Sequence, residues 1–238
     1  MIVLLLFLVV QFLCMNQLLP QIKLTINPKL YIKDPESSQL GREMIRESIH
    51  LINKIGFEKF TFKKLGQEIK SNESSIYRYF ENKHKLLLYL SSLYWGILEY
   101  RLVFETNNIN DPVKKLENAI DVIAGNPETI NADPKINLVE LRTIIIAEFT
   151  KSYHNKSVDM ENKEGFFSEY KRLINRIVDM ILQINADYPH AKTWASNLID
   201  GALHQHFLVE HFPSITDCKK NEPPNLFFKH QVNCLINA

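Results

Sequence analysis

The chain has 238 residues, of which 45% are hydrophobic and 23% are charged, and its formal net charge is +1. This profile allows one large or two modest domains with a proper core, and it excludes a disordered chain. The seven glycines are never closer than ten residues apart, which excludes a glycine-rich phosphate-binding loop and argues against a sheet fold with many tight turns.

Positive charge is concentrated near the N-terminus. Residues 40–90 hold ten Lys and Arg against six Asp and Glu, a net +4, whereas residues 91–238 hold 15 against 19, a net −4. A basic segment attached to an acidic body is typical of a protein that binds a polyanion. The three cysteines, Cys14, Cys218 and Cys234, form no CxxC pair and no closed disulfide framework. We therefore expect reduced thiols in a cytoplasmic protein.

Residues 1–37 are expected to be an apolar leader followed by an N-terminal arm. The apolar stretch at residues 2–14 is shorter than the roughly 20 residues that span a bilayer. No Lys or Arg precedes it and no small-residue cleavage site follows it, so it lacks two features of a signal peptide. We expect a mis-assigned start, with translation from a downstream position such as Met15, and no stable membrane association. The alternative is a protein tethered to the membrane by residues 2–14.

From Ser38 onward, apolar residues recur at spacings of three and four, which predicts helices. Asn72 and Asn82 are good N-caps, and aspartates before Pro112 and Pro134 mark two further helix starts. No convincing strand or repeat is present. The sequence therefore predicts an all-α protein of about nine helices. These are expected at about residues 41–55, 62–69, 73–80, 82–104, 112–124, 134–152, 166–186, 189–211 and 225–236.

The third of these helices begins with small hydroxyls and ends in three aromatics and an arginine. Three short helices with a tight turn between the second and third form a helix-turn-helix, whose third helix can enter a major groove. Ile76 and Phe80 would keep one side of this helix in the core. Small hydroxyls permit close approach to bases, and an arginine suits a phosphate or a guanine. The side chains left to face outward are Ser74, Ser75, Tyr77 and Arg78, with Tyr79 at the boundary.

Residues 41–90 resemble the DNA-binding domain of TetR-type transcriptional regulators. The resemblance rests on Gly56 after the first helix, Thr61 before the second, the segment SIYRYF at residues 75–80, and Lys83 followed by leucines. It implies a homodimer that binds a palindromic operator in double-stranded DNA, usually as a repressor. It also implies that an unknown small-molecule effector releases the operator.

The same resemblance implies a helix-turn-helix domain at residues 38–84 and a larger helical domain for ligand binding and dimerisation at residues 85–238. Phosphate contacts are implied for Thr61, Tyr77, Tyr79 and Lys83. The helix from Asn72 to Arg78, including Glu73, Ser74 and Ser75, would face the bases.

Two positions depart from the family pattern. Lys70 and Ser71 stand in the turn where a glycine and an apolar residue are usual, and a lysine in the left-handed region costs about 1 kcal/mol relative to glycine. Glu73 is unusual in facing DNA; it would favour the helix dipole or accept a hydrogen bond from a cytosine amino group.

The larger domain offers weaker signals. Candidate ligand-binding residues are Trp95, Tyr100, Arg142 and Glu148, for which core packing or internal pairing is the alternative. Small residues on the helix ending near residue 211 allow close helix approach and suggest a dimer interface, with intramolecular packing as the alternative. These interface candidates are Ala191, Ala195, Leu198 and Ala202.

We predict no metal site, no cofactor and no enzymatic activity. His204 and His206 diverge by about 200° on a helix, so one ion cannot bind both. His206 and Glu210 are better spaced, but no third ligand is evident. The competing hypothesis for the whole chain is a helical small-molecule-binding or interaction protein whose DNA-binding head no longer functions.

Overall fold

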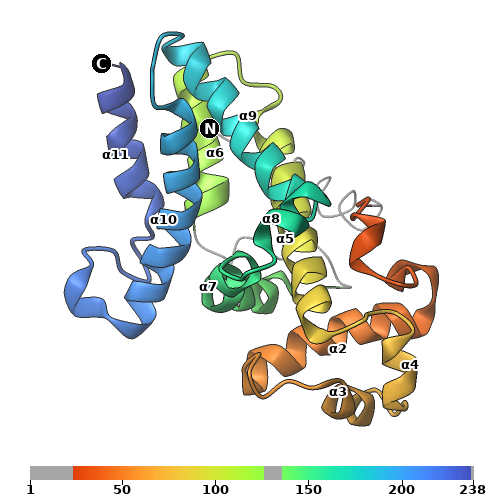
Figure 1. Cartoon of the computed structure of the whole chain (residues 1–238). Helices are drawn as coiled ribbons and strands as arrows, with labels where there is room; N and C mark the ends of the chain where they lie inside the picture. The colour runs from red at the N-terminus through yellow and green to blue at the C-terminus, as the bar shows by residue number, and fades with distance from the viewer. Residues whose placement is uncertain (1–23, 126–135, 237–238) are drawn as a thin grey trace, which may run out of the picture. The chain divides into compact units, whose positions relative to one another are not determined.

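The computed structural model describes residues 24–125 and 136–236. Within these ranges the chain folds into α-helices and short 3-10 helices, without a β-strand (Figure 1), which confirms the all-α prediction. The α-helices are α2 (Gln39–Ile55), α3 (Phe62–Glu68), α4 (Glu73–Tyr77), α5 (Lys83–Thr106), α6 (Pro112–Ala124), α7 (Leu138–Tyr153), α8 (Val158–Lys163), α9 (Ser168–Ile184), α10 (Ala191–His211) and α11 (Asn225–Ile236). The 3-10 helices are η2 (Pro28–Leu30), η3 (Pro35–Ser37) and η5 (Pro213–Ile215).

Most helix starts follow from capping side chains. Ser38, Thr61 and Asn72 each accept a hydrogen bond from a backbone N–H in the first turn of α2, α3 and α4. Asp111 caps α6, with a proline at its first position as expected. These caps satisfy amide donors that have no partner within the helix.

The start of α7 and the presence of α8 differ from the sequence prediction. α7 begins at Leu138, and Asn137 caps it by accepting a hydrogen bond from the Glu140 N–H at 3.1 Å. The expected start at Asp133 and Pro134 lies outside the described residues. α8 was not predicted, because its six residues are mostly polar and too few to show helical periodicity.

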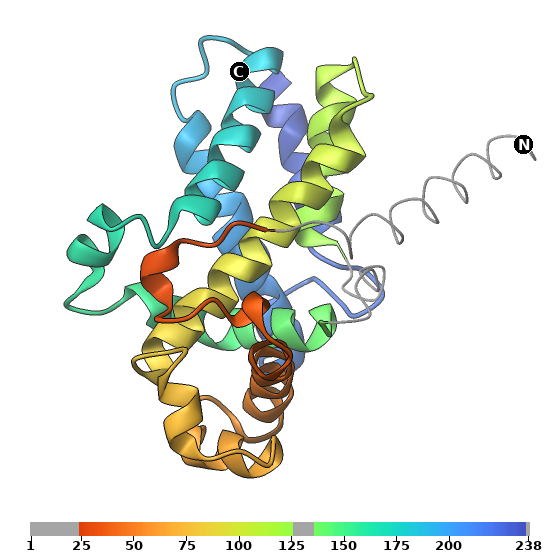
Figure 2. The same ribbon diagram turned by 90° about the vertical axis from the view of Figure 1, so that its right-hand side faces the viewer.

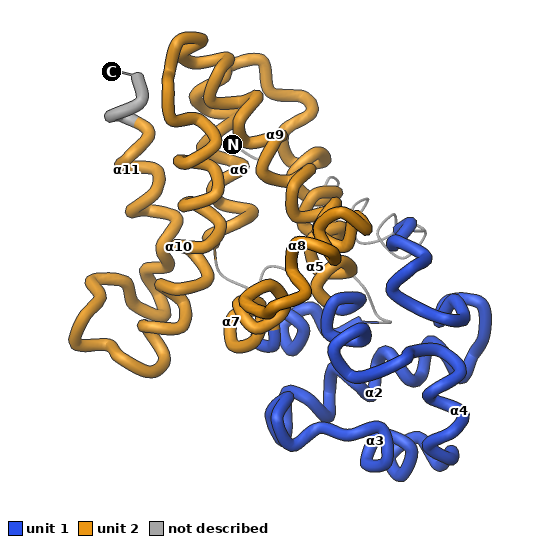
Figure 3. The backbone as a smooth tube through the Cα atoms, in the orientation of Figure 1, with its two compact units in different colours: residues 1–90, 127–144 blue, residues 91–126, 145–238 orange. Residues whose placement is uncertain are grey.

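The chain divides into two compact units (Figure 3). Unit 1 contains the described parts of residues 1–90 and 127–144, and unit 2 contains those of residues 91–126 and 145–238. Both α5 and α7 therefore begin in unit 1 and end in unit 2. The domain division after residue 84 stays a prediction.

Unit 1 packs α2, α3 and α4 around a core of aromatic and aliphatic side chains. Met44 and Ile49 of α2, Leu65 of α3 and Ile76 of α4 are all buried, as is Phe80 after α4. The inward positions expected for Ile76 and Phe80 are thus confirmed. This core holds α3 and α4 together without help from their polar faces.

The arm before α2 packs on the same unit, beside α2 in Figure 2. Leu30 and Pro35 are buried, and a Cβ atom at Gly41 would lie 2.2 Å from the Pro35 carbonyl oxygen. Only glycine lets η3 approach α2 this closely. The Ile32 N–H donates to the Tyr79 carbonyl at 2.7 Å, which ties the arm to the chain after α4. The expectation about residues 1–14 lies outside the described part of the chain.

Unit 2 is a bundle in which α6, α9, α10 and α11 lie side by side (Figure 1). α9 buries a stripe that contains Leu173, Ile177 and Ile181. α10 and α11 approach closely at Gly201, where a Cβ atom would lie 2.9 Å from the ring of Phe228. In the ranges 24–125 and 136–236, no helix has the length and apolar character needed to cross a membrane.

Candidate nucleic-acid interface and a groove in unit 2

α4 is anchored on one side and open on the other. Ile76 is fully buried, whereas Tyr77 is 48% exposed and Arg78 is also exposed. The Tyr77 ring rests edge-on against Phe62 of α3, with ring centroids 5.0 Å apart. This contact fixes the ring and leaves the phenol oxygen at the surface, where it can meet a phosphate oxygen.

The first turn of α4 is organised by Asn72. Its Oδ1 atom accepts hydrogen bonds from the Ser75 N–H at 2.8 Å and from the hydroxyls of Ser74 and Ser75, each at 2.7 Å. The two hydroxyls that were expected to face bases are thus held against the cap. Glu73 is half-buried in the same turn. Base contacts by these four residues stay predictions.

The turn between α3 and α4 has the strained geometry that the sequence suggested. Lys70 has φ = 51°, in the left-handed region that favours glycine. The Ser71 N–H donates to the Gly66 carbonyl at 2.8 Å, and a Cβ atom at Gly66 would lie 2.8 Å from the Ser71 carbonyl oxygen. The turn therefore packs tightly against Gly66, and Lys70 adopts the unfavourable left-handed conformation that this turn requires.

Tyr79 is buried rather than at the boundary, and its expected contact with a phosphate stays a prediction. Its side chain is only 3% exposed, and its hydroxyl lies 2.7 Å from Ser38 Oγ. The hydrogen bond with Ser38 lowers the pKa of Tyr79, with a smaller contribution from Lys33, while burial acts in the opposite direction. Lys33 Nζ lies 5.1 Å from the centroid of the Tyr79 ring. The sequence could not reveal this arrangement because the arm covers the ring.

Lys83 is half-buried and turned toward the loop after α2. Its Nζ atom donates to the carbonyls of Phe57 at 3.1 Å and Glu58 at 3.3 Å, and it lies 4.8 Å from the Phe57 ring centroid. Lys83 thus ties the start of α5 to that loop. Its contact with a phosphate stays a prediction, as does that of Thr61, whose Oγ1 atom accepts the Lys64 N–H at 3.2 Å.

Three exposed lysines close to these elements were not among the expected DNA-contacting residues, although Lys70 was noted for its place in the turn. Lys63 lies on α3, Lys70 in the turn and Lys33 on the arm, and all three are exposed. A lysine in the left-handed region and a lysine within an arm give no helical pattern, so periodicity could not select them. A single lysine that belongs to no motif of fixed spacing is a weak sequence signal for DNA binding.

The chain's similarity to known proteins agrees with this geometry. Residues 45–90, which include α3, α4 and most of α2, match the family model of the bacterial regulatory proteins of the tetR family. Residues 45–90 form a TetR-family helix-turn-helix domain. No curated protein sequence matches the chain.

Solved structures extend the TetR-type likeness of fold to most of the chain. AibR, crystallised with isovaleryl coenzyme A and operator DNA, is 12% identical with a TM-score of 0.52, over 80% of this chain and 95% of AibR. The ketosteroid regulator KstR2 of Mycobacterium tuberculosis is 12% identical with a TM-score of 0.52, over 84% of this chain and 95% of KstR2. The fatty acid degradation regulator FadR from Bacillus halodurans is 14% identical with a TM-score of 0.52, over 82% of this chain and 91% of FadR. The family and these neighbours are regulators rather than enzymes.

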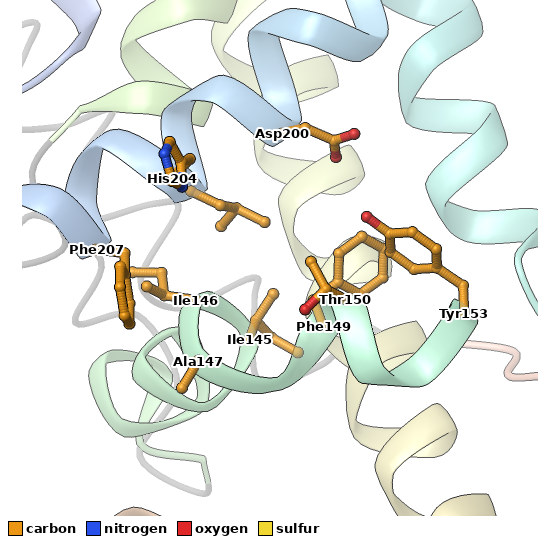
Figure 4. Close-up of a pocket in the computed structure, with 10 residues that line it drawn as sticks. Ile145, Ile146, Ala147, Phe149, Thr150, Tyr153, Asp200, His204 and Phe207 are labelled. Atoms are coloured by element: carbon orange, nitrogen blue, oxygen red, sulfur yellow. The ribbon is translucent and has the colours of Figure 1, made fainter. Parts of the chain in front are cut away.

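Unit 2 contains a groove of about 230 Å³ between α7 and α10 (Figure 4). Its walls are mainly apolar, and Tyr153, Asp200 and His204 supply its titratable groups. The lining residues are Ile145, Ile146, Ala147, Phe149, Thr150, Tyr153, Asp200, Leu203, His204 and Phe207. None of them was among the expected ligand-binding residues, although an aspartate within the otherwise apolar segment LIDGAL was a usable signal.

The Tyr170 hydroxyl donates to Asp200 Oδ1 at 2.8 Å. Burial raises the pKa of Tyr170, and the Asp200 charge raises it further. Partial desolvation raises the pKa of Asp200, while the hydrogen bond from Tyr170 and the nearby His154 act in the opposite direction. The carboxylate is therefore held in place but is less easily ionised than a fully solvated aspartate.

The four expected ligand-binding residues do not line this groove. Trp95 is buried, and its ring centroid lies 4.9 Å from that of Phe149, which lines the groove. Glu148 pairs with Lys151 at 2.8 Å, and Tyr100 is half-buried. Arg142 is buried in unit 1, whereas the other three belong to unit 2. Ligand contacts by these residues stay predictions.

The residues named for a dimer interface lie inside unit 2. All four side chains are buried within the monomer: Ala191, Ala195, Leu198 and Ala202. They allow α10 to approach α6 and α9, so another face of the helix would have to meet a second copy. His206, considered for a metal, instead has Nε2 3.1 Å from the Ala124 carbonyl oxygen.

Proposed function

We propose that this chain is a TetR-like transcriptional regulator that binds double-stranded DNA through α4. The observation that carries the proposal is the division of α4 into two sides. Ile76 anchors it in the core, while Tyr77 and Arg78 stay exposed at its C-terminal end. A helix supported in this way can insert into a major groove without unfolding its own domain.

We further propose a homodimer in the cytoplasm that represses transcription from a palindromic operator. A two-fold operator requires two reading heads related by symmetry. Unit 2 exposes large apolar side chains at its C-terminal end, which supports a self-complementary interface there. The AibR complex with operator DNA and isovaleryl coenzyme A supports a role in which a small-molecule effector controls DNA binding.

The test is DNA affinity measured by fluorescence anisotropy at several salt concentrations. The probe is the operator recovered by selection from a random-sequence DNA pool. A regulator that neutralises several phosphates releases counterions, so the logarithm of its affinity should fall steeply and linearly with the logarithm of the salt concentration. Selection of no sequence, together with weak salt dependence, would favour a helical binding protein with a non-functional head.

Matched variants locate the contact surface. Arg78→Ala should weaken operator binding by about 5- to 150-fold, as expected for loss of a base or phosphate contact worth about 1–3 kcal/mol. Tyr77→Phe should weaken it less and for all sequences alike. Tyr79→Phe is the control, because its hydroxyl contacts Ser38, and it should leave operator affinity unchanged. A loss in Tyr79→Phe equal to that in Tyr77→Phe would contradict the proposed surface.

A further inference from the structure

The groove between α7 and α10 combines one carboxylate with apolar and aromatic walls (Figure 4). Among its ten lining residues, Asp200 is the one Asp, Glu, Lys or Arg. No ion pair involves Asp200 within the described residues, and its resolved hydrogen bond comes from the neutral hydroxyl of Tyr170. The groove thus has a carboxylate that no lysine or arginine among its lining residues pairs with.

The aromatic rings near Asp200 form a connected cluster. Phe149 lies with its ring centroid 4.9 Å from that of Tyr153 and 5.1 Å from that of Tyr170. In Figure 4 the Asp200 carboxylate and the Tyr153 hydroxyl extend toward the same part of the groove. The faces of aromatic rings attract cations, and a carboxylate among such rings is a known way to recognise an ammonium group.

We propose that this groove binds a small organic cation, an amine or a quaternary ammonium compound with an apolar body. The role of this ligand as the effector rests on the proposed function. The ammonium group would pair with Asp200 and lie near Tyr153, while the apolar body would contact Ile145, Ile146 and Leu203. A volume of about 230 Å³ suits a molecule of modest size.

Other ligand classes fit the groove less well. A carboxylate or phosphate would face Asp200, and neither lysine nor arginine lines the groove to offset the repulsion. The isovaleryl coenzyme A bound by AibR is such a phosphate-bearing ligand, so we expect a different effector here. A neutral apolar molecule would fit the walls but would leave the partly desolvated carboxylate without a positively charged partner.

The test compares choline with its neutral carbon isostere, 3,3-dimethylbutan-1-ol, by calorimetric or NMR titration of the full chain. Choline should bind at least about tenfold more tightly than the alcohol, because only the charge differs between them. In Asp200→Asn, choline affinity should fall to that of the alcohol, while the affinity of the alcohol itself should change by less than about twofold. Tyr170→Phe keeps the ring and should retain most of the preference for choline.

Three outcomes would overturn the proposal: equal affinities for choline and the alcohol, choline binding that Asp200→Asn leaves unchanged, or isovaleryl coenzyme A that competes with choline. Circular dichroism and operator affinity of Asp200→Asn without ligand check that the variant is folded. Salt-dependent operator binding without choline binding would contradict the proposed ligand class but support the proposed function. Choline binding without any DNA binding would support the ligand class but contradict the proposed function.

Discussion

Lys70 shows how much folding free energy the conformation of a single turn residue can cost. It is the one non-glycine residue with positive φ in the described chain, and its position closes the turn between α3 and α4. The left-handed conformation costs a residue with a Cβ atom about 1–2 kcal/mol. The sequence already pointed to this position, because a glycine is usual there in the TetR pattern. The exposed Lys70 side chain places a positive charge beside the start of α4.

Lys70→Gly should stabilise the protein by about 0.5–1 kcal/mol. Relief of the strain is partly offset by the greater conformational freedom of glycine in the unfolded chain. Lys70→Ala removes the same charge without relieving the strain and should give no stabilisation. Urea unfolding measures the difference between the two variants. Equal stability of both would show that the turn is not strained.

Both Lys70 variants should also lose operator affinity to the same extent, since each removes one positive charge next to α4. The slope of log affinity against log salt should become shallower by about one in each. A loss confined to one variant would mean that turn geometry, rather than charge, controls binding.

Asp200 makes stability depend on pH. Desolvation raises its pKa in the folded state above the unfolded value of about 3.9. Ionisation of Asp200 therefore costs the folded state free energy above its folded pKa, and this cost disappears below the unfolded pKa. The Tyr170, Tyr153, His154 and His204 side chains, which surround the carboxylate, are the same in the wild type and in Asp200→Asn.

We expect Asp200→Asn to gain stability relative to the wild type as the pH rises from 4 to 7. The Asn side chain can still accept the Tyr170 hydrogen bond, so the variant loses the ionisation cost but keeps the contact. Urea unfolding of both proteins at pH 4 and pH 7 measures the effect. A stability difference that is independent of pH would contradict the assigned role of desolvation. In the wild type, a bound cation should offset the same cost.

The sequence predicted single residues well where local rules decide their positions. Ile76 and Phe80 point inward because helical periodicity requires it, and Asn72 caps α4 because few residues serve there better. The sequence did not indicate the burial of Tyr79, which depends on a segment about 40 residues earlier in the chain. Contacts between distant segments are not encoded in local spacing.

Among the helices, those in the C-terminal part of unit 2 expose several large apolar side chains. Phe212, Ile215, Leu226 and Phe227 are each at least half exposed, on or next to α10, η5 and α11. Such side chains are costly in water and mark surfaces that meet a partner. The small residues of α10, in contrast, serve packing within the monomer, where Gly201 contacts Phe228.

Replacing Leu226 and Phe227 by serine should therefore convert the proposed dimer to a monomer. Loss of two large apolar contacts worth about 1.5–3 kcal/mol each should weaken association by at least about 100-fold. Sedimentation velocity over a range of concentrations measures the change. The matched control is Met160→Ser with Leu182→Ser, which removes two exposed apolar side chains from α8 and α9. Equal association of both double variants would rule out α11 as the interface.

Element boundaries were the least predictable part of the fold. α4 ends at Tyr77 rather than near residue 80, and the Tyr79 and Phe80 N–H groups both donate to the Ile76 carbonyl. The chain turns there so that Phe80 enters the core and the Tyr79 carbonyl meets the arm. Helical spacing alone continues through these residues, so it could not signal the turn.

For the molecule as a whole, two continuous helices link the units. α7 is instructive, because its first turns belong to unit 1 and its later turns form one wall of the groove. Within unit 1, Glu140 of α7 lies 3.2 Å from His50 Nδ1 of α2. The sequence of α7 thus includes both Glu140, which contacts α2 within unit 1, and the groove residues Ile145 to Tyr153 of unit 2.

If α7 transmits ligand binding, a flexible residue between these two parts should weaken the coupling. Thr143 is exposed and makes a local hydrogen bond to the Val139 carbonyl, so it can be changed without disturbing the core. Thr143→Gly introduces helix flexibility that costs about 1 kcal/mol relative to Thr143→Ala. Both variants should bind operator as the wild type does when no ligand is present.

The coupling is the ratio of operator affinities without and with saturating choline, which for typical allosteric proteins is about 5- to 150-fold. It should fall at least about twofold in Thr143→Gly and stay at the wild-type value in Thr143→Ala. The reciprocity of coupling supplies an independent measurement. In each variant, operator DNA must change choline affinity by the same factor by which choline changes operator affinity. A coupling that is equal in the glycine and alanine variants would mean that the signal reaches the DNA-binding domain through α5, the other helix common to both units.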